Sequence, residues 1–298
     1  MKAVMMHHTH PNERRSILRL SLSACLAMSS LGCLAAAAPT RADTVKLEPL
    51  ADNWISSCST GCTVNNGGMG ELRVRASWWG SPGNFEPKNF RSLLTFDLGS
   101  LPADENLITH ATMGLYYFEA AGPPHSDPVG RTYDVRRLTN AWDEMNSTWQ
   151  ARDDYNEPNP VYWDSYDSGE PEYQPGGGDF ASTVYASAVV PASAGQWVTW
   201  DVTALVKEGL GGTDNFGFLI KDAAEYESDP GGGEISYIAK FRSGEFADNA
   251  FRPYLEVTFE DNPIPTVSEW GLIVTAMLMV TAGTLILQSR TRMSRASG

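Results

Sequence analysis

The sequence predicts an all-β protein, an antiparallel β-sandwich of jelly-roll type, followed by a single C-terminal transmembrane helix. Between residues 52 and 259, short segments in which apolar and polar residues alternate recur with Gly, Pro, Asn and Asp between them. This alternation is typical of half-buried strands, and about ten such strands with turns between them suit a sandwich. Two apolar runs, one near each end of the chain, lie outside this region.

Residues 1–42 are predicted to be a signal peptide with its n-region. Arg14, Arg15 and Arg19 precede an apolar stretch of small residues at 20–38. Small residues occupy the two positions that a signal peptidase reads before Asp43, so we expect cleavage there. Signal peptidase is therefore one expected partner, and the rest of the chain is expected to be exported.

The predicted strands follow one another without an internal domain boundary, so residues 43–263 are expected to form one β domain. The segment 71–75 shows the alternation well, because Leu72 and Val74 stand between charged residues. An irregular stretch rich in Trp and Tyr, 140–178, interrupts the series, and a short helix is expected at 201–209. The predicted strands are 52–55, 71–75, 91–98, 111–118, 133–138, 183–190, 197–200, 216–221, 235–241 and 253–259.

The charge of this domain limits its partners. Residues 43–263 contain 14 Lys and Arg against 34 Asp and Glu, a net charge of −20. Nucleic acid is excluded as a partner because its phosphates require a basic face. Strongly anionic glycans are disfavoured as well, unless the few arginines cluster or a metal ion bridges.

Cys58 and Cys62 are the only cysteines that remain after the predicted cleavage. In an oxidising compartment we expect them to form a small disulfide loop. A zinc site would need more ligands than His110 and His125 supply, and a redox pair more usually has two residues between its cysteines.

The C-terminal segment carries no charge between Glu269 and Arg290, and Arg290, Arg292 and Arg295 follow. As a helix over 270–289 it would span roughly 30 Å, about the thickness of a bilayer core. The basic tail is expected on the cytoplasmic side and the β domain outside. The residues that lead into this helix are Ile264, Pro265, Thr266, Val267, Ser268, Glu269, Trp270 and Gly271.

This segment, 264–298, resembles the IPTL-type C-terminal sorting signal of Gram-negative bacteria, with Val267 where leucine is usual. The resemblance implies that an exosortase-like transpeptidase cuts near the motif. The protein would then be exported across the inner membrane of a Gram-negative bacterium, held in the membrane by the helix, and transferred to the cell surface or the medium. Pro265 favours an extended, readable peptide at this point.

The β domain contains the segments Arg91–Leu98, Leu101–Pro102, Ile108–Thr112 with Leu115–Tyr116, Arg137–Glu144 with Thr148–Trp149, Asp201–Thr203 and Arg252–Val257. In these segments it resembles the DNRLRE (disaggregatase-related) domain. That family is similar to carbohydrate-binding modules, so the resemblance implies glycan binding on a β-sandwich without catalysis. Most of the matching residues also have structural explanations. The resemblance therefore indicates the fold more than it indicates a ligand-binding site.

Four aromatic residues are predicted to bind the ligand: Trp78 and Trp79 in a glycine-rich loop, and Tyr162 and Trp163 in the irregular stretch. Exposed aromatic rings stack on the C–H faces of sugars. The alternative is that these residues fold back as lids over the sandwich.

One structural calcium ion is a further expectation. Residues with oxygen ligands occur in pairs at 52–53, 65–66, 153–154 and 214–215, and singly at Asp222. The spacing of a calcium loop is absent, so the sequence does not identify the ligands. No catalytic motif is present, so no catalytic residue is predicted.

The sequence thus predicts a surface-sorted, non-catalytic protein that binds carbohydrate or an extracellular matrix polymer. A structural or adhesive protein that makes protein contacts in a biofilm matrix is the alternative. A polysaccharide-degrading enzyme is the second one.

Overall fold

A computed structural model describes residues 41–57, 62–81, 84–122, 126–156, 158–166, 176–225, 235–260 and 267–296 of the protein. Within these residues the helical segments are η1 (Glu105–Leu107), α2 (Thr203–Leu210), η2 (Asn249–Phe251) and α3 (Val267–Ala296). The strands are β1 (Ala42–Leu47), β2 (Pro49–Ser56), β3 (Glu71–Ser81), β4 (Asn84–Pro87), β5 (Phe90–Phe96), β6 (Ile108–Ala120), β7 (Thr132–Arg137), β8 (Ala151–Asp153), β9 (Val161–Tyr162), β10 (Ala186–Val189), β11 (Gln196–Asp201), β12 (Phe218–Asp222), β13 (Ile235–Arg242) and β14 (Tyr254–Glu260).

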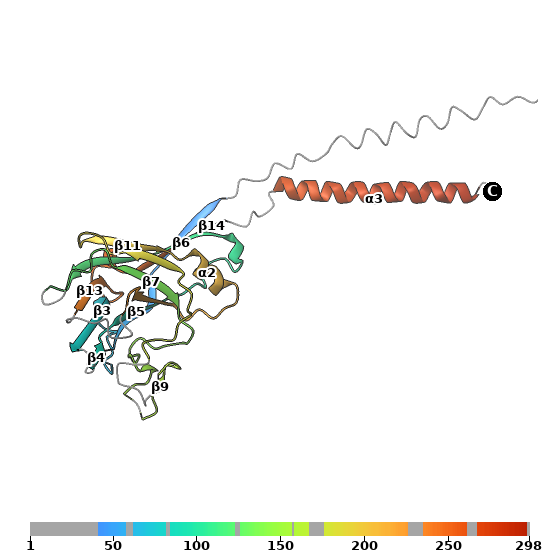
Figure 1. Ribbon diagram of the computed structural model, residues 1–298. Coiled ribbons are helices and arrows are strands. Elements are labelled where there is room, and N and C mark those ends of the chain that lie inside the picture. Colours follow the sequence, from blue (N-terminus) through green and yellow to red (C-terminus); the bar gives the residue numbers. More distant parts are fainter. Residues whose placement is uncertain are drawn as a thin grey trace, which may run out of the picture. The chain divides into compact units, whose positions relative to one another are not determined.

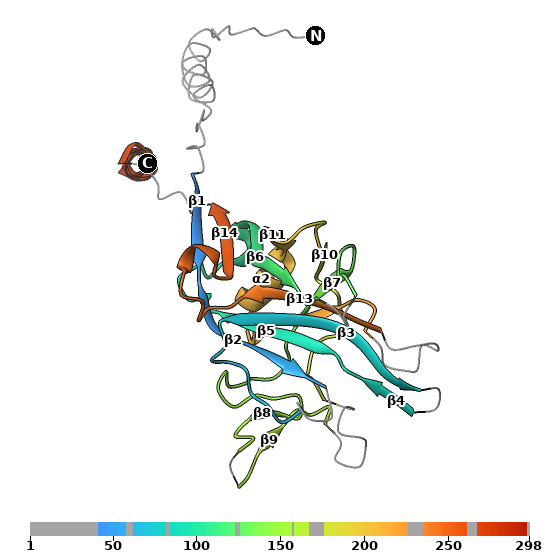
Figure 2. The same ribbon diagram turned by 90° about the vertical axis from the view of Figure 1, so that its left-hand side faces the viewer.

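The described strands confirm the all-β, antiparallel prediction. Twelve of them form one hydrogen-bonded sheet in the order β1-β14-β6-β13-β3-β5-β12-β7-β10, with β11 on β6, β2 on β5 and β4 on β3. The sheet folds over into two layers (Figures 1 and 2). One layer contains β1, β14, β6 and β11, and the other contains β2, β5, β12, β7 and β10. Most neighbours in this order are distant in sequence, as a jelly-roll connection requires.

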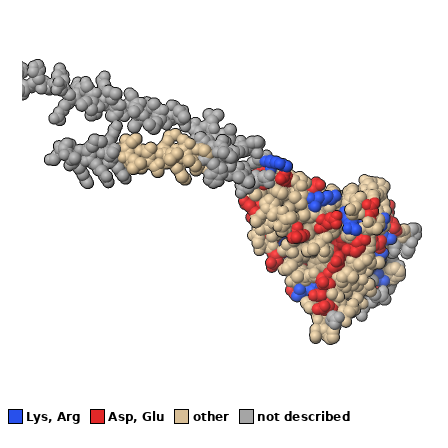
Figure 3. Space-filling model, turned by 180° about the vertical axis from the view of Figure 1, so that it is seen from behind, with Lys and Arg blue, Asp and Glu red and all other residues tan. Residues whose placement is uncertain are grey.

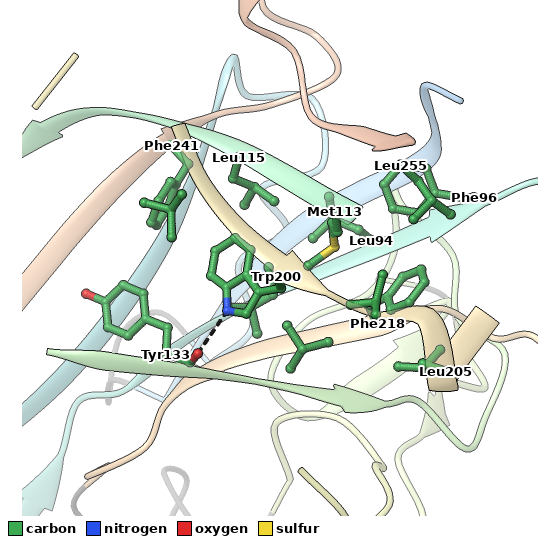
Figure 4. Packing of buried hydrophobic residues seen from close by; sticks show 14 of the residues in the cluster. Leu94, Phe96, Met113, Leu115, Tyr133, Trp200, Leu205, Phe218, Phe241 and Leu255 are labelled. Carbon is green, nitrogen blue, oxygen red and sulfur yellow. Dashed lines mark hydrogen bonds between the residues drawn. The ribbon is translucent and has the colours of Figure 1, made fainter. Parts of the chain in front are cut away.

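The main core lies between the two layers. Strand alternation directs Met113, Leu115 and Tyr117 of β6 inward, where they meet Leu94 and Phe96 of β5. Trp200 is buried at the centre, and its indole N–H donates to the carbonyl oxygen of Tyr133 at 2.9 Å (Figure 4). That hydrogen bond satisfies a polar group that burial would otherwise leave without water.

A second, smaller core lies on the opposite face of the β2-β5-β12 layer. Ile55, Leu93 and Leu219 point away from the main core, because their sequence neighbours point into it. The aromatic stretch predicted to be irregular covers this face and contributes Trp149 and Trp163 to the second core. It contains the short β8–β9 hairpin (Figure 2). The stretch is therefore a packed cover over the sheet.

A network of buried charges lies beneath this cover. Arg91 of β5 donates to the Glu225 carboxylate, with Nη2 and Oε2 at 2.7 Å, and Lys221 Nζ lies 2.8 Å from the same oxygen. The Glu225 side chain is 1 % exposed. The guanidinium of Arg91 also lies 4.6 Å from the ring centroid of Trp149 and donates to the carbonyl oxygen of Gly177 at 2.8 Å. Arg91 thus joins the sheet to the cover, and the buried Glu225 carboxylate holds the Arg91 guanidinium in place.

The two ends of the β domain lie side by side. Strand β1 pairs with β14 in antiparallel register, with Ala42 opposite Glu260. The predicted signal-peptidase site before Asp43 therefore falls at the start of β1, although residues 1–40 lie outside the described part. The start of β1 and the end of β14 therefore lie at the same edge of the sandwich (Figure 2).

Helix α3 contains the segment for which the sequence predicts a helix at 270–289. Its described apolar side chains are exposed, among them Val274, Met277, Val280 and Leu287. Within the part of the chain that the structure describes, no helix is both long and apolar enough to cross a membrane.

Candidate functional site

Half-buried aromatic rings gather on the outer surface of the β11-β6-β14 layer. We call Tyr116, Trp197, Phe251 and Tyr254 the aromatic face. The ring centroids of Tyr116 and Trp197 are 5.4 Å apart, those of Trp197 and Tyr254 4.9 Å, and those of Tyr116 and Phe251 4.5 Å. Tilted or edge-on geometry at these distances is favourable for aromatic pairs. The four rings therefore form one continuous apolar surface that solvent still reaches.

Strand pairing positions these rings. Trp197 of β11 lies directly opposite Tyr116 of β6, and Tyr254 of β14 lies opposite Gly114 of β6. A Cβ atom at Gly114 would lie 2.4 Å from a ring carbon of Tyr254, so only glycine leaves room for the ring to lie across the strand. The same alternation that sends Val198 and Trp200 into the core turns Trp197 outward.

Polar and charged side chains continue the same surface beyond the rings. Lys46 of β1 is exposed, and its ammonium lies 4.2 Å from the ring centroid of Tyr254. Glu256 lies opposite Lys46 across β1 and β14, and its charge adds to burial in raising the pKa of the Tyr254 hydroxyl. Asp201 of β11 accepts two hydrogen bonds from Thr203, which lower the pKa of its carboxyl. Apolar rings bordered by hydrogen-bonding groups can hold a ligand with both kinds of surface.

The predicted pair Trp78 and Trp79 points to opposite faces of the sheet. The expected loop is the continuation of β3, which reaches Ser81 and pairs with β4. Successive residues of a strand face opposite sides, so Trp78 is 0 % exposed in the molecule while Trp79 is 43 % exposed. The prediction that Trp78 presents an exposed ring is therefore wrong. Trp79 stays a candidate, with the Lys88 ammonium 4.4 Å from its ring centroid.

Tyr162 and Trp163 are divided for a similar reason. Trp163 is 1 % exposed, belongs to the second core, and donates its indole N–H to the carbonyl oxygen of Thr148 at 2.9 Å. The prediction of an exposed Trp163 ring is wrong, and the lid alternative describes it. Tyr162 is 43 % exposed and stacks on Tyr166, with ring centroids 4.7 Å apart. Tyr162 therefore stays a candidate, separate from the aromatic face.

Three carboxyl groups meet at a second place. One oxygen each of Asp52, Glu144 and Glu245 lies within 4.8 Å of the others. Asp52 is buried and accepts a hydrogen bond from the Gly244 N–H, and its own N–H donates to Glu144 at 2.9 Å. Burial first, and then the charge of Glu245, raise the pKa of Asp52 well above its usual value, and burial raises that of Glu144. A shared proton or a cation would relieve this repulsion.

The oxygen donors of this cluster suit Ca²⁺, which accepts carboxylate and carbonyl ligands in flexible geometry. Of the predicted oxygen pairs, 52–53 and 65–66 lie beside it, because Asn65 donates to the carbonyl oxygen of Glu144 at 2.6 Å. The calcium ion itself stays a prediction.

Asp52→Asn is expected to stabilise the protein at neutral pH when a chelator is present. The pKa of Asp52 is higher in the folded than in the unfolded state, so protonated Asp52 stabilises the fold at pH values below its unfolded pKa. This contribution is lost as the pH rises through the folded-state pKa. The melting temperature, followed from acidic to neutral pH in EDTA, should therefore fall more steeply with pH for the wild type than for the variant. If Ca²⁺ binds here, adding it should raise the melting temperature of the wild type alone.

Asp104→Asn provides a control of opposite sign, because hydrogen bonds from Asn106 lower the pKa of this exposed carboxyl. The small contribution of the Asp104 carboxylate to stability should be present at neutral pH and lost in acid. An Asp52→Asn variant that melts below the wild type throughout this range would contradict the assignment.

Two predicted sites fall partly outside the described residues. Cys62 is buried, whereas Cys58 lies outside the described part, so the disulfide stays a prediction. Ile264, Pro265 and Thr266 of the sorting motif lie outside it as well, and Val267–Gly271 form the start of α3.

The antiparallel sandwich, its aromatic sheet face and the C-terminal motif define a β-sandwich module of a surface-sorted protein. The model of the disaggregatase related repeat domain matches residues 81–257, more than half of the chain, and the protein belongs to that family. The IPTL-CTERM motif matches residues 262–290, which indicates export, attachment to the cell surface and processing by an exosortase-like enzyme. No curated protein matches the chain.

Proposed function

We propose that this protein binds carbohydrate or another matrix polymer at the cell surface, without catalysis, and that the aromatic face is its binding site. The observation that carries the proposal is the continuous cluster of Tyr116, Trp197, Phe251 and Tyr254 on a solvent-facing sheet. Sugar rings have apolar C–H faces and hydroxyl edges, and this surface offers aromatic rings beside Lys46, Asp201 and Glu256.

The protonation of nearby carboxyls supports a non-catalytic role. A glycosidase needs a general acid with a raised pKa close to a second carboxylate. Hydrogen bonds from Thr203 keep the pKa of Asp201 low. Asp52, whose pKa is raised, is a buried residue of β2 and does not lie on the aromatic face. The carboxyls with suitable pKa and the rings that would hold a sugar are therefore in different places.

The route to the surface is the second part of the proposal. We propose that the chain crosses the inner membrane of a Gram-negative bacterium and is held there by its C-terminal segment until an exosortase-like transpeptidase cuts near the motif. The uncharged stretch between Glu269 and Arg290 supports anchoring, and the adjacent motif supports the cut.

Trp197→Ala is expected to weaken glycan binding about five- to thirtyfold, because a central aromatic contact contributes on the order of 1–2 kcal/mol. Purified full-length protein would be applied to a glycan array, and hits measured by calorimetry. Unchanged melting of the variant would show that only the surface was altered. Trp79→Ala, which removes an exposed ring elsewhere, is the matched control and should leave binding unchanged.

Other outcomes identify the alternatives. Loss of glycan binding in Trp79→Ala or Tyr162→Ala, with binding by Trp197→Ala unchanged, would assign the binding site to Trp79 or Tyr162 instead. Binding of no glycan, with and without Ca²⁺, would favour the structural or adhesive protein. Turnover of any polysaccharide on the array would favour the enzyme.

A further inference from the structure

We propose that the aromatic face selects amino-sugar polymers with free, protonated amines over neutral and anionic glycans. This inference rests on the proposed function and adds the chemical class of its ligand. It follows from the charges that surround the rings, from the position of Lys46 and from the charge of the whole domain.

Two carboxylates lie in one row at one end of the rings. Glu256 of β14 and Asp201 of β11 are both opposite Thr112 of β6, so the three residues form one row across the sheet. Both carboxylates are exposed, and the next row in the strand direction contains Tyr254. Hydrogen bonds from Thr203 keep Asp201 ionised. A ligand that stacks on the rings therefore has two carboxylates within reach of its substituents.

The rings already attract a cation. Lys46 is exposed and free to extend into water, yet its ammonium lies 4.2 Å from the ring centroid of Tyr254 and 6.0 Å from that of Trp197. The negative face of an aromatic ring attracts a cation at these distances. A protonated sugar amine would find the same attraction, and it would compete with Lys46 for it.

The domain as a whole repels anions. Among the charged side chains on the face in Figure 3, Asp and Glu (red) cover more surface than Lys and Arg (blue), and the net charge of residues 43–263 is −20. A glycan that carries carboxylates would approach against this field, whereas a polyamine chain would be drawn toward it. General attraction of this kind must be separated from selection at the aromatic face.

The test compares two oligomers that differ only in the amine. Full-length protein would be titrated with the glucosamine hexamer and with the fully N-acetylated hexamer at a pH that protonates the amines. We expect the free-amine oligomer to bind roughly tenfold more tightly, as a partly desolvated cation–π contact with a nearby carboxylate permits. A galacturonate hexamer should bind most weakly. Glu256→Gln should reduce the preference, and Lys46→Met should raise affinity for the free-amine oligomer alone.

The control variant is Asp214→Asn, which removes one exposed carboxylate in the loop after α2. The neighbouring Asn215 side chain donates to the carbonyl oxygen of Phe96 at the end of β5, a strand that does not belong to the aromatic face. If this variant reduces the preference as much as Glu256→Gln does, the attraction is general and the inference fails. Equal binding of both hexamers, abolished by Trp197→Ala, would overturn the inference and leave the proposed function intact. Binding of neither hexamer nor any other glycan would overturn both.

Discussion

Glu225→Gln is expected to lower the free energy of unfolding by about 3–5 kcal/mol, because it removes the charge of the buried carboxylate that two buried cations share. Arg91 and Lys221 both contact Glu225, and their side chains are 7 % and 9 % exposed. In the variant the two positive charges would repel each other beneath the cover. Denaturant unfolding followed by tryptophan fluorescence would measure the change, since Trp149 stacks on Arg91.

An exposed ion pair provides the control for this variant. Lys240 and Glu119 lie 2.8 Å apart with the Glu119 side chain 48 % exposed, so Glu119→Gln should change stability by no more than about 1 kcal/mol. If both variants lose the same small amount of stability, the buried Glu225 carboxylate does not hold Arg91 beneath the cover in the way described.

Trp163→Ala is expected to destabilise the protein by about 3–5 kcal/mol, the range for removing a large aromatic residue from a core. The ring is 1 % exposed, and its N–H donates to Thr148, so the variant would create a cavity and leave the Thr148 carbonyl without this donor. Thermal and denaturant unfolding would measure the loss. Glycan binding by the remaining folded fraction should be unchanged.

Tyr162→Ala is the matched variant, because Tyr162 precedes Trp163 in the chain and is 43 % exposed. It should lose about 1 kcal/mol or less, mainly the stacking on Tyr166. A tolerated Trp163→Ala substitution with lost glycan binding would contradict the assignment of Trp163 to the second core.

The aromatic face illustrates why sequence reasoning found the fold more easily than the site. The segment 111–118 alternates clearly enough to predict a strand, and in a strand Tyr116 and Tyr117 must face opposite sides. Which side is solvent depends on the pairing of β6 with β11 and β14, residues about 80 and 140 positions away in the chain. Trp197, two positions after Gly195, was the residue in the sequence that could have indicated this site. Its position is informative only once the pairing of β11 with β6 shows that its ring faces outward.

The predicted aromatic pairs failed in part for the same reason. Gly80 and Pro82 suggested a loop, but β3 continues through Trp78 and Trp79, and the extended backbone sends one ring into the core. The irregular stretch had no periodicity to show that it would cover a sheet. Its packing depends on contacts with Leu93 and Leu219.

The sequence by itself determined the strand-forming alternation, the acidic character of the domain and the sorting motif, because each of these depends on residues that are neighbours in the chain. Only the tertiary structure decided which aromatic rings face solvent, and it alone brought Asp52, Glu144 and Glu245 together. Those properties depend on long-range strand pairing and on which sheet face is covered, and neither is encoded by the spacing of residues within a single segment.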